Sequence, residues 1–198
     1  DLVLTLIGVN EKAYKSLNKE LEYASLRLLS RYTPENSDYW IKMARLGKKQ
    51  GKEAEVKQTL QEIYDTSIAE STRPAIEAWQ ANDREHHEKA LLLYRQSLLL
   101  DPEQSEIRQE IFDLAIMLHD FKTARQQADW FQTVTDVGKE ELMTHLGVMW
   151  MKLAAPEKAL PIWEAMNQEY PGQFVFALEK ARALYLLCRD KEALAILN

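Results

Sequence analysis

The chain has 198 residues, of which 46% are hydrophobic and 28% are charged, a composition typical of a folded protein. Six glycines and six prolines are too few for the many turns of a β-sandwich or barrel, and a single cysteine, Cys188, excludes an internal disulfide and a cysteine-based zinc site. The net charge of −6 disfavours general nucleic-acid binding, because phosphate backbones repel an acidic chain.

The first predicted element is an apolar segment, Leu2 to Val9, which is shorter than the roughly 18 residues of a membrane span. We expect it to form a buried first helix; the tail of an anchor or signal is the alternative. The chain begins at Asp1 rather than at a methionine, so we expect it to have been processed or excised from something longer.

Small and apolar residues then recur along the chain at a step of 34 residues. One series holds Val56, Ala90, Ala124, Ala159 and Ala193, with one extra residue before Ala159, and a second holds Leu60, Tyr94, Ala128, Trp163 and Leu197. Because positions four apart share one face of a helix, these series predict the buried stripe of one helix in a repeating pair.

Further signals mark the ends of the predicted helices. Gln50-Gly51-Lys52 and His119-Asp120 are expected to be the short turns within two of the pairs. Ser37 or Asp38 can cap the helix that carries Trp40. Pro161 should make the helix that opens at Pro156 begin late or bend.

Together these features resemble the tetratricopeptide repeat. The residues that carry the resemblance, besides the recurring alanines, are Trp40, Leu146-Gly147 and the closing prolines Pro34, Pro102 and Pro171. The resemblance covers residues 37–198 well and 3–36 weakly. It implies an all-α, right-handed solenoid of antiparallel helix pairs with about 5.5 repeats in a single domain, 1–198. The repeats would be 3–36, 37–70, 71–104, 105–138, 140–173 and a partial 174–198.

Such a fold implies a non-catalytic interaction scaffold that needs no cofactor. It would bind a partner protein or peptide in a concave groove lined by the first helix of each pair, either alone or in a multiprotein complex. The residues predicted to face the groove are Ile41, Arg45, Lys48, Trp79, Asp113, Val148, Met151, Arg182 and Tyr185. Trp79 and Tyr185 are the best anchor candidates, because aromatic residues are enriched at interface hot spots, although each could instead pack into a neighbouring repeat.

A basic stretch lies in the second repeat. Lys42, Arg45, Lys48, Lys49 and Lys52 cover about three helical turns. It is either a solvated face or a contact for an acidic segment of a partner.

Two other functions stay open at this point. The first is a periplasmic repeat segment of a bacterial envelope or exopolysaccharide-export protein that docks other export components. We also expect the native protein to continue past Asn198, because residue 198 falls within the second helix of its repeat and no polar cap follows.

The second is an all-α metal-dependent hydrolase. His119-Asp120, with His86 or His87 and with Asp136, loosely resembles the metal set of HD-type phosphohydrolases. The histidines fall in predicted turns, so we expect no metal site and no enzyme, and we expect Cys188 to be a passive thiol.

Overall fold

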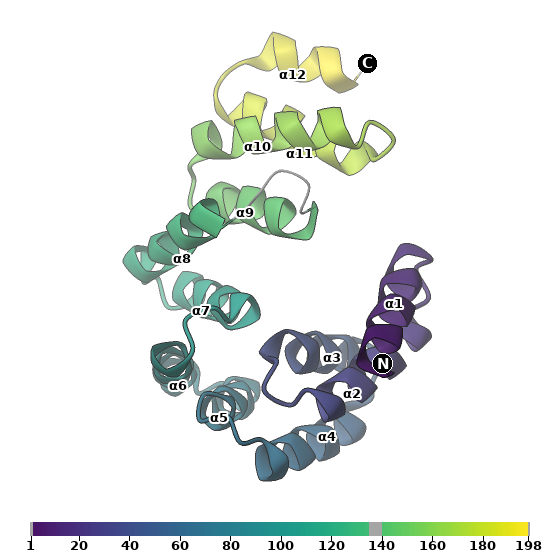
Figure 1. The fold of residues 1–198 in the computed structure, drawn as a ribbon. Coiled ribbons are helices and arrows are strands. Elements are labelled where there is room, and N and C mark those ends of the chain that lie inside the picture. Colours follow the sequence, from purple (N-terminus) through teal and green to yellow (C-terminus); the bar gives the residue numbers. More distant parts are fainter. Residues whose placement is uncertain (1, 135–139, 198) are drawn as a thin grey trace. The chain divides into compact units, whose positions relative to one another are not determined.

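The computed structural model describes residues 2–134 and 140–197, and every regular element in this part of the chain is an α-helix (Figure 1). The first six helices are α1 (Leu2–Lys15), α2 (Lys19–Tyr32), α3 (Ser37–Lys49), α4 (Glu53–Thr66), α5 (Thr72–Asp83) and α6 (His87–Leu100). The next six are α7 (Ser105–Met117), α8 (Phe121–Val134), α9 (Glu140–Lys152), α10 (Pro156–Glu169), α11 (Phe174–Leu186) and α12 (Asp190–Leu197). None of these helices has both the length and the apolar character that crossing a membrane requires.

The helices belong to two compact units, Asp1–Leu114 and Ala115–Asn198, with the boundary inside α7. In the first unit α1 packs on α2, α2 on α3 and α5 on α6. In the second unit α9 packs on α10, α10 on α11 and α11 on α12. Two consecutive helices correspond to each of the ranges expected for the repeats, whose exact bounds stay a prediction. The extra residue before Ala159 is expected near 136–139, which lies outside the described residues.

The turn inside each pair repeats one backbone conformation. Among the described residues, those with positive φ are Leu17, Gly51, Glu85, His119, Ala154 and Cys188, one in each turn between the two helices of a pair. After each of them the next backbone N–H donates to a carbonyl five residues earlier, as Lys52 N does to Gly47 O at 2.9 Å and Asp120 N to Ala115 O at 2.8 Å. This is the Schellman ending of a helix, which satisfies carbonyls of the last turn. The turns predicted at 50–52 and 119–120 are confirmed.

The core follows the predicted series. Ala90, Tyr94, Ala124, Ala128 and Ala159 have no exposed surface. Their burial explains the 34-residue step, because an alanine at these positions lets a neighbouring helix approach closely. Leu197, the last member of the second series, differs, because it is about half exposed.

Two glycines allow the closest approaches between helices. A Cβ at Gly47 would lie 2.4 Å from a methyl of Val56 and 2.7 Å from the ring of Tyr23. A Cβ at Gly147 would lie 2.4 Å from the indole of Trp163. Both distances are shorter than van der Waals contact, so each helix pair depends on the missing side chain.

Of the two effects expected of Pro161, a late start of its helix or a bend in it, the late start is wrong. The helix α10 begins at Pro156, not after Pro161, and it continues through Pro161. Pro161 lies in the second turn of α10, where only one backbone hydrogen bond is lost to the missing N–H.

Candidate functional site

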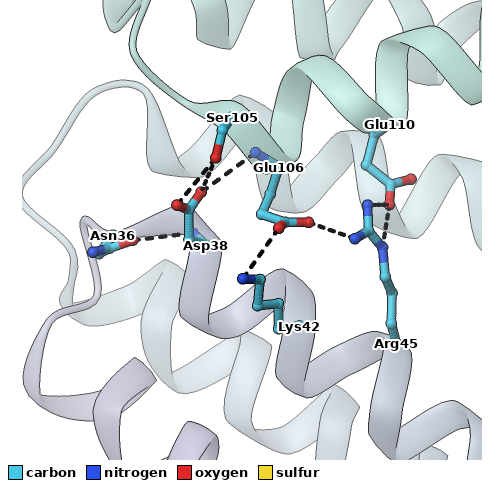
Figure 2. A network of polar contacts seen from close by, with 7 residues as sticks. All are labelled: Asn36, Asp38, Lys42, Arg45, Ser105, Glu106 and Glu110. Carbon is cyan, nitrogen blue, oxygen red and sulfur yellow. Dashed lines mark hydrogen bonds and ion pairs between the residues drawn. The ribbon is translucent and has the colours of Figure 1, made fainter. Parts of the chain in front are cut away.

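The main polar feature of the first unit joins two helices that are far apart in sequence. Three side chains of α3, Asp38, Lys42 and Arg45, contact the first turns of α7 at Ser105, Glu106 and Glu110 (Figure 2). We call these six residues the α3–α7 contact. The order of contacts ascends on both helices, so α3 and α7 lie side by side and run in the same direction.

Arg45 holds the centre of this contact. Its Nε donates to Oε1 of Glu110 at 2.8 Å, and its Nη1 donates to Oε2 of Glu106. Lys42 Nζ lies 3.5 Å from Oε1 of Glu106. The Glu106 and Glu110 side chains are only 5% and 10% exposed, so Arg45 forms ion pairs with two carboxylates that are nearly shielded from water.

Asp38 ends the contact at the amino end of α7. Its carboxylate accepts hydrogen bonds from Ser105 Oγ at 3.2 Å and from the Glu106 N–H at 3.3 Å. The expectation that Ser37 or Asp38 caps α3 is wrong. The cap of α3 is Asn36, whose Oδ1 accepts from the Asp38 N–H at 3.1 Å. Asp38 instead satisfies a free N–H of α7, a helix two pairs further on.

The contact has more acids than bases. Burial, and then the neighbouring Glu106, raises the pKa of Asp38 above its usual value. Burial also raises the pKa of Glu110, although Arg45 opposes this shift. Burial alone would lower the pKa of Arg45, but Glu110 and Glu106 outweigh it and raise that pKa. The arginine is therefore firmly charged, and the acids are held at a desolvation cost.

The same buried region includes the hydroxyl of Tyr94 on α6. Burial, and then the nearby Glu110 carboxylate, raises the pKa of Tyr94 well above its ordinary value. The Tyr94 hydroxyl is therefore held in its neutral form beside the contact.

A pocket of about 330 Å³ lies elsewhere in the first unit, between α3, α4 and α5. Its apolar lining comes from Ala44, Val56, Leu60 and the half-buried Trp79. The charged residues around it are Lys48, Glu53, Lys57, Asp83 and Arg84. A volume of this size falls at the lower end of ligand pockets and fits one or two side chains of a bound chain.

The groove residues predicted in the first unit do not share one open surface. Lys48 and Trp79 line the pocket, and Lys48 Nζ also pairs with Asp83 at 2.6 Å. Arg45 is bound to α7. Ile41 is fully buried, which corrects the expectation that it faces a groove. Asp113 is half-buried and lies close enough to Glu110 to raise the pKa of that residue.

In the second unit, the predicted residues lie on α9 and α11. Val148 is exposed and Met151 is half-buried on α9. On α11, Tyr185 is 67% exposed and Arg182 is exposed as well. Phe174 and Leu178 are also exposed on α11, and Leu178, Arg182 and Tyr185 share one helical face.

The residues that were considered for metal chemistry have other positions in the fold, in or beside the turns within helix pairs. His119 and Cys188 supply the positive-φ position of two turns, and both side chains are exposed. His87 Nδ1 lies 2.8 Å from Asn82 Oδ1, across the turn between α5 and α6. Asp136 lies outside the described residues. Among the residues that are described, no three histidine, cysteine or acidic side chains are grouped to hold a metal ion.

Sequence reasoning missed the acidic half of the α3–α7 contact. Glu106 and Glu110 are four residues apart on α7, and Lys42 and Arg45 are three residues apart on α3, so each pair shares one helical face, which was the available signal. No signal in the sequence predicts that helices from repeats two apart contact each other.

No protein-family model matches the sequence, and no curated protein sequence matches it. Solved structures do match. PilW, a widely conserved type IV pilus biogenesis factor, aligns with 99% of this chain and 90% of its own at 10% identity and a TM-score of 0.60. PilF of Pseudomonas aeruginosa aligns with 98% of this chain and 87% of its own at 11% identity and a TM-score of 0.55.

A tetratricopeptide repeat protein from Parabacteroides merdae aligns with 98% of this chain and 77% of its own, at 18% identity and a TM-score of 0.53. Because all three identities are low, the likeness shows the fold alone. The predicted all-α fold of tetratricopeptide-like helix pairs is confirmed.

Proposed function

Since the chain has the tetratricopeptide repeat fold, we propose that it is a non-catalytic scaffold that binds a segment of a partner protein. The observation that carries the proposal is the pocket between α3, α4 and α5, where the half-buried Trp79 stands beside Val56 and Leu60. A large aromatic side chain in such a setting can hold an apolar side chain of a bound segment with little loss of its own rotamer freedom.

The surroundings of the pocket suit a chain rather than a small molecule. Lys57 and Arg84 give the lining positive charge beyond the Lys48–Asp83 pair, while Glu53 is acidic. Charged neighbours of the inserted residue would set the direction and register of the bound segment. The occupant that we propose is therefore an extended protein segment with one apolar anchor residue.

The exposed face of α11 is a second proposed surface, with Tyr185 as its anchor. Docking of other components in a bacterial envelope or polysaccharide-export assembly remains a prediction from the sequence.

Selection of binding peptides tests the proposal. A displayed library of random peptides is selected on the wild-type chain, and the affinities of enriched peptides are measured by fluorescence anisotropy. Trp79→Ala should weaken binding at least about ten-fold, the effect of losing one hot-spot side chain. The matched control is Leu99→Ala, because Leu99 is 84% exposed and lies outside the pocket.

Two outcomes would count against the proposal. If the enriched peptides share no apolar residue, the proposal that an apolar residue anchors the bound segment is wrong. Unchanged affinities in both Trp79→Ala and Tyr185→Ala would remove both proposed surfaces.

A further inference from the structure

We propose that the α3–α7 contact is a partner site which the protein itself fills, and that an acidic segment of a partner binds the basic face of α3 by displacing Glu106 and Glu110 of α7. This inference rests on the proposed function as a partner-binding scaffold, and it adds the chemistry of the partner.

The covered face of α3 is the first observation. Asp38, Ile41, Lys42 and Arg45 lie on one side of the helix, at spacings of three and four residues. Ile41 is fully buried, and both bases turn toward carboxylates of α7 (Figure 2). The surface that a first helix of such a pair offers to a partner is therefore covered by the chain's own acidic helix.

The chemistry of the contact is the second observation. An acidic segment of a partner could give Arg45 the same charge-assisted bonds that Glu106 and Glu110 give it now. Arg45 would then keep a partner of opposite charge. Breaking a buried ion pair is costly only when it leaves one charge buried without such a partner. In exchange, Glu106 and Glu110 would return to water and recover the hydration that burial removes.

The packing of α3 and α4 on α5 is the third observation. The pocket lies between the end of this helix pair that carries Lys48 and Glu53 and the last turns of α5, so the packing is incomplete at that end. Residues 67–71 connect α4 to α5 at the opposite end and are held in place, because Ser67 Oγ donates to Thr72 Oγ1 at 3.0 Å and Ser97 Oγ donates to the Ser71 carbonyl at 2.9 Å. Separation of α3 from α7 would therefore open the pocket end of α3 and α4 and leave the connection in place.

Binding of an acidic helical peptide tests this directly. The probe is a fluorescein-labelled peptide with the sequence of Ser105–Met117, and the control probe has glutamine in place of both glutamates. The host is the full chain carrying Glu106→Gln and Glu110→Gln, which weakens the internal competitor. It should bind the acidic probe at least about ten-fold more tightly than the wild type does, which corresponds to one charge-assisted hydrogen bond.

The matched control host carries Glu55→Gln and Glu62→Gln. These glutamates also pair with arginines of a neighbouring helix, Arg27 and Arg31, but they are much more exposed. This host should bind the probe as the wild type does. Equal affinity of both hosts for the acidic probe, or equal binding of the two probes, would overturn the inference.

A second measurement uses the wild type and needs no folded variant. Excess acidic probe should speed hydrogen exchange at the α7 amides of residues 105–114 and slow it at Lys42–Arg45. Unchanged exchange under saturating probe would also overturn the inference. If peptides selected through Trp79 still bind in that case, only the α3–α7 inference fails and the scaffold function stands.

Discussion

Arg45 of α3 and Glu110 of α7, 65 residues apart in sequence, form an ion pair in which Nε and Nη2 of the arginine lie 2.8 Å and 2.6 Å from the same carboxylate oxygen. This ion pair joins α3 to the part of α7 that belongs to the first unit. Its burial makes it a sensitive point for stability.

Replacing Arg45 by alanine should destabilise the protein more than removing any exposed ion pair. The change leaves the Glu106 and Glu110 carboxylates buried without their main partner, which costs about 3–5 kcal/mol. Arg31→Ala is the control, because it breaks only the exposed pair with Glu62 and should cost about 0.2–1 kcal/mol. Urea unfolding measures the free energy of unfolding of both variants. Equal decreases in the two would show that the buried contact contributes little to stability.

Stability should depend on pH through Asp38, whose pKa is raised by burial and by Glu106, with Lys42 opposing. A carboxyl with a raised folded pKa favours folding below its unfolded pKa, about 4, and loses that contribution as pH rises through the folded value. Asp38→Asn keeps an oxygen acceptor for the Glu106 N–H but does not titrate. The free energy of unfolding of the wild type, relative to this variant, should therefore fall as pH rises from about 4. A difference that grows with pH would contradict the assignment.

The glycine at 147 should be intolerant of a side chain. Gly147→Ala places a Cβ 2.4 Å from the Trp163 indole and should destabilise the second unit by about 1–3 kcal/mol through overpacking. Gly8→Ala is the control, because a Cβ there meets nothing within 4 Å and alanine favours the helix. Thermal unfolding of the two variants should shift in opposite directions.

A glycine in the turn between α5 and α6 should stabilise the protein. Glu85 has a φ of 62°, a conformation that is strained for a residue with a Cβ. Glu85→Gly should raise the free energy of unfolding by about 0.5–1 kcal/mol, because relief of this strain exceeds the added entropy of the unfolded chain. The reverse change, Gly51→Ala at φ 70°, should lower it. The argument fails if both substitutions act in the same direction.

The sequence predicted the helix pairs well because their signals are local. The two series that contain Ala90 and Tyr94 mark positions that are buried inside one helix pair or between adjacent pairs, and these positions recur at a fixed step. The turn at Gln50–Lys52 likewise follows from one glycine between two helical patterns.

The candidate site could not be predicted in the same way. Ile41 and Arg45 were placed on a groove because the repeat pattern gives the faces of a helix but not what covers them. Arg45 pairs with residues of α7 that are more than 60 residues further along the chain, and Ile41 is fully buried. The cap of α3 was missed for a related reason. Asn36 caps the helix, because the Asp38 carboxylate accepts a hydrogen bond from α7 instead.

The six intra-pair turns share a conformation although a leucine, a glycine, a glutamate, a histidine, an alanine and a cysteine occupy the same position. The two helices that each turn joins therefore impose the backbone path, and the side chain at this position can vary in chemistry. Cys188, the one cysteine and an exposed turn residue, is consequently a natural attachment point for a fluorescent or spin label. A label there would report on the last helix pair without any engineered residue.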